Sequence, residues 1–205
     1  VVKEKLTEYA SLYDKSGEQH YDTISAFIKS IRGSDPNAAL FYLARMIIAG
    51  EDPKFIARRL LILASEDIGN ANPNALLLAN NCFQAVNVIG YPESELILSQ
   101  TTVYLATSLK SNASYKAIKL AKEMARKYPN APIPMQIRNA PTKLMKDLNY
   151  GLGYQYAHDF ENNFVDMEFM PKELAGQKLY EPGNNPHEHK QREFLKMRWK
   201  DKYEY

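Results

Sequence analysis

The amino-acid sequence predicts an all-α protein, and two of its features support that prediction. Four junctions repeat the same punctuation, a glycine, one to three further residues and then a proline, in RGSDPNAAL, AGEDPKFIA, GNANPNALL and IGYPESELI. Between the junctions, apolar residues recur every three or four positions, which is the period of one helix face. Loops this short require successive helices to pack nearly antiparallel. We therefore expect a compact bundle of short antiparallel helices.

Each junction combines signals that end one helix and start the next. Asp35, Asp52 and Asn72 suit the N-cap, where a side-chain oxygen accepts a hydrogen bond from a free backbone N–H group. The glycines suit the left-handed position just past a helix end, and the prolines suit the first helical position, where no N–H bond is lost. The glycines and prolines concerned are Gly33, Gly50, Gly69, Gly90, Pro36, Pro53, Pro73 and Pro92.

The apolar periods place the helices in order along the chain. An early helix is expected over residues 18–31, with Phe27 and Ile31 among its inward residues. Four helices follow the four junction prolines, and another begins after Ser111 or Asn112. The similar spacing of the junctions reflects shared punctuation rather than a true repeat, because the segments share no side-chain consensus.

The sequence changes character in residues 128–141, where four prolines exclude a regular helix. A short helix over 142–148 is expected next. Residues 149–183 have few helical periods, and residues 163–171 could form a short strand or lie extended. A last helix is expected over about 186–200. This part is predicted to be an irregular C-terminal extension rich in proline, glycine and aromatic residues.

Composition limits the class of protein. The 205 residues carry a net charge of only +2, which is not the strong basic bias of a dedicated nucleic-acid binder. No run of about 18 apolar residues suggests a membrane span, and the first residues do not resemble a signal peptide. The single cysteine, Cys82, excludes an internal disulfide and is predicted to be a core residue. We expect a cytoplasmic protein without a membrane partner.

We predict no catalytic residue, no cofactor site and no metal site in this chain. It has no GxxxxGK[ST] motif, and the Gly-x-Gly at 151–153 lacks a third glycine and a preceding strand. His187 and His189 have no third ligand. His158 and Asp159 could form the base and orienting acid of a hydrolase, which is the enzymatic alternative. However, adjacent residues seldom point at each other, and no nucleophile accompanies them.

Charged residues suggest two kinds of contact. Arg59 and Glu66 are seven residues apart on one helix face, so we expect a structural ion pair or a contact with a neighbouring subunit. Basic residues near the short helix and in the tail could bind phosphate groups, with the tail's tryptophan stacking on a base. The tail could equally be a solvated terminal helix. The candidate DNA or partner contacts are Arg138, Lys143, Lys146, Lys190, Arg192, Arg198 and Trp199.

Several long blocks closely resemble the C-terminal region of the RarA/MgsA family of AAA+ ATPases, which act in replication-associated recombination and are related to the Werner helicase-interacting protein. The blocks are residues 17–76, KSNASYKAI at 110–118 and RNAPTKLMKDLNYGLGYQYAHDF at 138–160, in the family's order. The residues interpreted as a structural signature are Asp35, Pro36, Asp52, Pro53, Arg59, Glu66, Asp67, Asn139, Pro141, Gly151, Gly153 and Tyr154.

The resemblance implies an organisation and a function. Residues 1–16 would end an upstream ATPase lid region, 17–183 would form a helical oligomerisation domain resembling a clamp-loader collar, and 184–205 would be a basic terminal helix or tail. Family members form homotetramers, and their ATP and Mg²⁺ bind in an upstream AAA+ core that is absent here. The expected role is assembly of a DNA-dependent ATPase associated with the bacterial nucleoid. The alternative is a module that binds DNA or single-stranded-DNA-binding protein.

Overall fold

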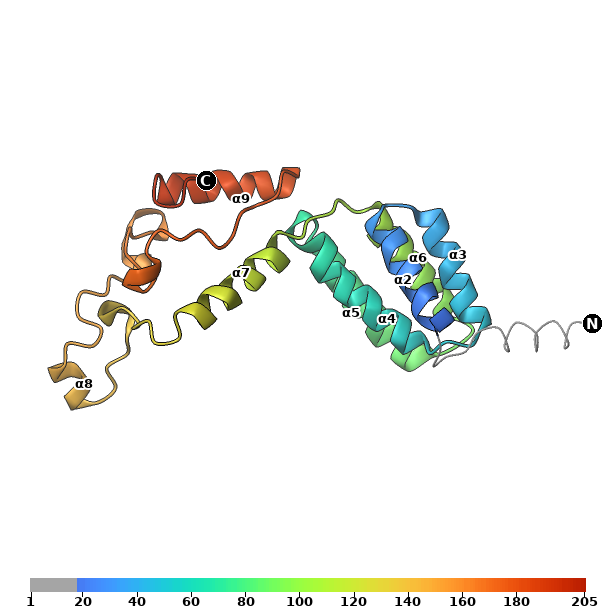
Figure 1. Ribbon diagram of the computed structural model, residues 1–205, viewed down its shortest axis with the longest axis horizontal. Helices are drawn as coiled ribbons and strands as arrows, with labels where there is room; N and C mark the ends of the chain where they lie inside the picture. The colour runs from blue at the N-terminus through green and yellow to red at the C-terminus, as the bar shows by residue number, and fades with distance from the viewer. Residues whose placement is uncertain (1–17) are drawn as a thin grey trace, which may run out of the picture. The chain divides into compact units, whose positions relative to one another are not determined.

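A computed structural model describes residues 18–205, and Figure 1 shows the helices that they form. The chain divides into two compact units. Of the described residues, the first unit contains those from 18 to 115 together with Gly183–Glu188, and the second contains Lys116–Pro182 with His189–Tyr205. The described residues are helical or irregular and include no strand, so the all-α prediction is confirmed. The strand considered for residues 163–171 does not form. The predicted lid segment, residues 1–16, lies outside the described residues.

The first unit is a bundle in which α2 packs on α3, α3 on α6, and α4 and α6 on α5 (Figure 1). Its core includes Phe27, Met46 and Leu60, which have no exposed surface. Each large apolar side chain buried in this way stabilises the fold by about 1.5–3 kcal/mol. The helices are α2 (Glu18–Arg32), α3 (Pro36–Ile48), α4 (Pro53–Leu63), α5 (Asn74–Ile89) and α6 (Ser94–Thr107).

The caps predicted for α3 and α4 are confirmed. Asp35 accepts hydrogen bonds from two N–H groups in the first turn of α3, both at 3.0 Å. Asp52 accepts one from the N–H of Lys54 at 2.9 Å. Pro36 and Pro53 are the first residues of these helices. Each cap stabilises its helix start by about 1 kcal/mol, because it satisfies N–H groups that have no partner within the helix.

The helix ends agree with the prediction at three of the four junction glycines. Gly50, Gly69 and Gly90 have positive φ angles of 73°, 48° and 72°. The prediction for Gly33 is wrong, because the left-handed residue after α2 is Ser34, with φ of 62°. The turn is thus displaced by one residue. Ser34 adopts the left-handed conformation there, which is less favourable for a residue with a side chain than for glycine.

The cap predicted at Asn72 is also wrong. Its side-chain amide donates to Tyr104 Oη at 2.9 Å and to Ser108 Oγ at 3.2 Å, both at the end of α6. Helix α5 begins at Asn74, one residue after Pro73, and has no side-chain cap. Asn72 therefore joins two helix ends in space instead of closing the helix that follows it.

The remaining helices begin close to their predicted positions, and irregular chain separates them. Single helical turns occur at 135–137, 157–159, 161–163 and 172–174. Within residues 18–205, no helix is long and apolar enough to cross a membrane. The three helices are α7 (Ala113–Lys127), α8 (Lys143–Asp147) and α9 (Pro186–Trp199).

Candidate functional site

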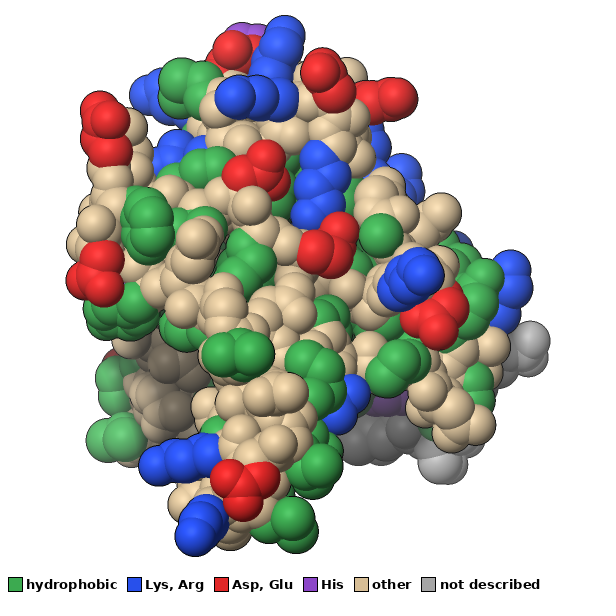
Figure 2. Space-filling view, turned by 90° about the vertical axis from the view of Figure 1, so that its left-hand side faces the viewer, with side chains coloured by type: hydrophobic (Ala, Val, Ile, Leu, Met, Phe, Trp, Pro, Cys, Tyr) green, Lys and Arg blue, Asp and Glu red, His purple; other side chains and the backbone are tan. Residues whose placement is uncertain are grey.

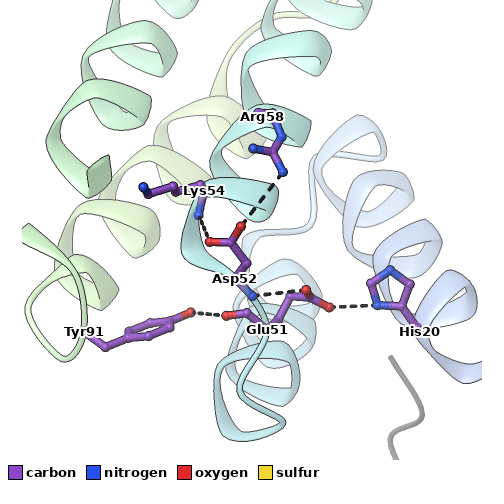
Figure 3. Close-up of polar contacts among 6 residues, drawn as sticks. All are labelled: His20, Glu51, Asp52, Lys54, Arg58 and Tyr91. Atoms are coloured by element: carbon purple, nitrogen blue, oxygen red, sulfur yellow. Dashed lines mark hydrogen bonds and ion pairs between the residues drawn. The ribbon is translucent and has the colours of Figure 1, made fainter. Parts of the chain in front are cut away.

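A buried polar cluster ties together the start of α2 and two loops of the first unit (Figure 3). Glu51 Oε2 lies 2.8 Å from His20 Nδ1, and both side chains are about nine-tenths buried. Glu51 Oε1 accepts the N–H of Asp52 at 3.1 Å, and Tyr91 donates its hydroxyl to the carbonyl of Glu51 at 3.1 Å. Every one of these contacts holds a loop in place, so the cluster stabilises the fold.

The Tyr91 hydroxyl gives this cluster a measurable pH dependence. Burial raises the pKa of Tyr91 from 10.0 to about 12, with the carboxylates of Glu95 and Asp52 adding to it. The neutral phenol is thus favoured in the folded state, so its stabilisation is present below about pH 10 and is lost as the pH rises towards 12. Tyr91→Phe should lower the free energy of unfolding by about 1 kcal/mol at pH 8. In urea titrations this difference should shrink at pH 11, and an equal difference at both pH values would contradict the assignment.

The ion pair in this unit differs from the predicted one. Arg32 reaches Asp67 with two hydrogen bonds, Nε to Oδ1 at 2.6 Å and Nη2 to Oδ2 at 3.1 Å. The hydrogen bond to Asp67 raises the pKa of Arg32. Among the described residues, Arg59 and Glu66 form no ion pair. The reason is that residues 64–68 form a π-helical turn, whose wider coil moves Glu66 off the face on which a spacing of seven residues was counted.

The segment around α8, in the second unit, is shaped by backbone contacts. Thr142 caps α8 by accepting the N–H of Met145 at 3.3 Å. Gly151 has a φ of 75°, and its N–H donates to the carbonyl of Met135 at 2.9 Å. A Cβ at this position would lie 3.0 Å from the carbonyl oxygen of Arg138. Glycine is therefore required here both for its φ angle and for this close approach, as the signature predicted.

Gly151 and Arg138 lie in the lining of a cavity of about 580 Å³. It is lined by the candidate contact Arg138 together with three residues of the predicted structural signature, Asn139, Gly151 and Tyr154. The guanidinium of Arg138 lies over the ring of Tyr150, 5.2 Å from its centroid. The other lining residues are Gln136, Ile137, Ala140 and Phe169.

The basic candidates of the tail have partners within the chain, with one exception. Arg192 bonds to Glu181 and to the carbonyl of Pro182, and the guanidinium of Arg198 lies 3.6 Å from the ring centroid of Phe194. Lys190 is exposed. The remaining tail candidate, the ring of Trp199, packs edge-on against three aromatic rings, those of Phe164, Phe169 and Tyr203. Near α8, Lys143 and Lys146 are exposed and remain candidate contacts.

The residues considered for catalysis and metal binding are not brought together with a partner group. His158 lies against the ring of Tyr156 at 5.0 Å, and within the described residues no hydrogen bond joins it to Asp159. Across residues 18–205, no three His, Cys, Asp or Glu side chains gather as a metal site would require. Cys82 is buried in the core as predicted, and burial raises the pKa of its thiol.

Gln136 and Phe169 are among the residues of the cavity that sequence reasoning missed. Gln136 donates to the carbonyl of Glu168 at 3.0 Å, which brings Phe169 next to a segment more than thirty residues earlier. Neither residue belongs to a short motif. Their proximity depends on a long-range contact, so no local signal in the sequence could have paired them.

The sequence of this chain is similar to those of known AAA+ ATPases in their C-terminal part. A family model described as MgsA AAA+ ATPase C terminal matches residues 33–199, and one described as AAA C-terminal domain matches residues 1–32. Replication-associated recombination protein A of Coxiella burnetii is 44% identical over 206 residues, covering 100% of this chain and 45% of its own length. The protein of the same name from Escherichia coli K12 is 46% identical over 186 residues, covering 88% and 42%.

A eukaryotic protein is similar to the same extent. ATPase WRNIP1 of Dictyostelium discoideum is 42% identical over 177 residues, covering 86% of this chain and 20% of its own length. The chain thus spans less than half the length of each of these relatives. Since the first family model matches most of its residues, the chain belongs to the MgsA AAA+ ATPase C-terminal family.

Proposed function

We propose that this chain assembles with copies of itself into a homotetramer, and so serves as the oligomerisation domain of an AAA+ ATPase acting in replication-associated recombination. The observation that carries the proposal is the lack of a core in the second unit. In this unit, which lies wholly within the described residues, only Val165, Leu174 and Pro182 among its hydrophobic residues are buried. A stable unit of this size normally buries more than half of the surface of its unfolded chain.

The apolar residues that would fill a core are instead at the surface. Figure 2 looks onto the face that carries α8 and shows hydrophobic side chains lying among charged ones. Exposed apolar side chains that gather in one unit are the groups that a protein interface would cover. The large hydrophobic residues exposed in the second unit are Ile118, Ile133, Met135, Leu144, Leu148, Leu152, Tyr154, Tyr156, Phe160, Phe169, Phe194 and Met197.

Helix α8 and the chain that follows it carry part of this surface. Leu144, Leu148 and Leu152 follow one another at intervals of four residues and are 68%, 52% and 69% exposed. Leu148 follows the last residue of α8 and so lies about one helical turn from Leu144. Leu152 lies beyond Asn149, whose φ of 60° ends the helix. Because the three leucines contact little of their own chain, they are suited to insert between the helices of a second copy.

The subunit number and the cellular role rest on the family. The names of the relatives describe an ATPase and a protein of replication-associated recombination. We infer that the parent of this chain binds ATP and Mg²⁺ in an upstream AAA+ core, that four cores are held together by this domain, and that the assembly acts on DNA in the cytoplasm. Assembly would let several cores act on the same DNA molecule.

Solution mass tests the proposal directly. The chain should elute from a size-exclusion column with a light-scattering mass near four times 23.5 kDa, and should keep it on dilution to low micromolar concentration, as a large obligate interface requires. A monomer at tens of micromolar would contradict the proposal. In that case the exposed surface would be covered by another part of the parent or by a different partner.

A further inference from the structure

We propose that the cavity lined by Arg138, Tyr154 and Phe169 binds an unpaired base of a single-stranded nucleic acid. The site lies within the second unit. Its rings belong to the exposed apolar surface described above, so the proposal requires a subunit interface that leaves Tyr154 and Phe169 uncovered. Its volume of about 580 Å³ is in the range of small-ligand sites and exceeds the needs of one base and its sugar. Flat rings and an arginine in one cavity are the groups on which unpaired bases stack.

Two of the aromatic rings are available for stacking, and one of them is held in position. Tyr154 is 51% exposed and Phe169 is 44% exposed. Phe169 packs edge-on against Trp199, with ring centroids 6.2 Å apart, and Trp199 is itself held by Phe164 and Tyr203. The tail therefore holds the ring of Phe169 in place. Trp199, which the sequence suggested as a DNA contact, would contribute to binding by positioning Phe169.

Arg138 is positioned to bind an anion beside the base. Its Nε–H donates to the carbonyl of Ile133 at 2.7 Å, and its guanidinium lies over the ring of Tyr150. These contacts fix the guanidinium, and its terminal amino groups make no hydrogen bond to the part of the chain that the structure describes. Such groups bind phosphate oxygens or the edge of a base. The exposed amide of Asn139, also in the lining, adds a donor and an acceptor for the base edge.

The charges around the cavity favour the binding of a polyanion. Helix α8 connects the two lining segments in sequence and carries Lys143 and Lys146, both exposed, with Asp147 as its acidic residue. The carboxylate of Glu168, next to Phe169, is neutralised by Lys202, whose Nζ lies 3.2 Å from Oε2. Phosphates flanking a stacked base would therefore meet two lysines against the single carboxylate of Asp147 on α8.

The test compares a 12-residue oligothymidylate with a 12-residue abasic sugar-phosphate chain, using fluorescence anisotropy on the whole 205-residue chain. We expect the oligothymidylate to bind more tightly than the abasic chain. Tyr154→Ala should weaken binding of the oligothymidylate roughly tenfold, the size of one lost stacking contact, and should leave the abasic chain unaffected. Arg138→Ala should weaken both. Oligouridylate serves as a third probe, because an equal response to it assigns the site to unpaired bases of either nucleic acid and a weaker one assigns it to DNA.

Matched variants separate stacking from folding. Tyr154→Phe keeps the ring and should bind like the parent chain. Tyr156→Ala removes an equally exposed tyrosine outside the cavity lining and should also leave binding unchanged. The light-scattering mass of each variant shows whether assembly is intact. A loss of assembly can therefore be distinguished from a loss of base binding. Equal affinity for the oligothymidylate and the abasic chain, or normal binding by Tyr154→Ala, would overturn the proposal, as would displacement by an acidic peptide but not by nucleic acid.

Discussion

Replacing both Leu144 and Leu148 with glutamate is expected to convert the assembled chain into monomers. Both side chains are more than half exposed, so the change removes little packing within the chain. In an assembled protein, however, two carboxylates would enter an apolar interface, and each buried charge without a partner costs several kcal/mol. Light scattering should show the mass fall from near four times 23.5 kDa to about 23.5 kDa, while far-UV circular dichroism keeps the helical signal.

A control variant separates this effect from general charge repulsion. Asn149→Asp with Gln155→Glu adds the same two negative charges at exposed polar positions of the same segment. Aspartate tolerates the left-handed backbone of Asn149, whose φ is 60°. This variant should remain assembled. A leucine variant that keeps its mass would show that α8 lies outside the interface.

Replacing Phe27 with alanine should destabilise the first unit by about 3–5 kcal/mol, because the change removes a large ring from a closely packed site and leaves a cavity. Phe27 has no exposed surface and lies among the core residues of α2, where the neighbouring helices cannot close the space completely. Urea unfolding followed by circular dichroism at 222 nm should show a lower midpoint with an unchanged slope.

Phe41 provides the matched comparison for this prediction. It is 60% exposed on α3, so Phe41→Ala should change the free energy of unfolding by less than about 1 kcal/mol. Similar losses for both variants would mean that the ring of Phe41 is covered in solution, and the solution mass of Phe41→Ala would then show whether a second copy covers it.

Local sequence chemistry determined most of the helices of this protein. Asp35 with Pro36, and Asp52 with Pro53, specify their helix starts by interactions within four residues, so their positions could be predicted exactly. The inward position of Phe27 follows from the helical period in the same way. At Asn72 the same reasoning failed, because its amide finds Tyr104 and the end of α6 instead of the next helix.

Tertiary structure alone decided the contacts between distant segments. The π-helical turn at 64–68 moved Asp67 towards Arg32, and no spacing rule for an α-helix anticipates that pairing. The cavity likewise depends on the long-range hydrogen bond from Gln136 to the carbonyl of Glu168, because this bond brings Phe169 into the same lining as Arg138.

The sequence by itself thus determined most of the helices, the caps at Asp35 and Asp52 and the glycine needed at 151, because each depends on interactions between near neighbours in the chain. The structure decided which charged groups pair and which apolar residues stay uncovered. These depend on the packing of whole elements, and a leucine such as Leu144 has the same apolar side chain whether it fills a core or forms an interface.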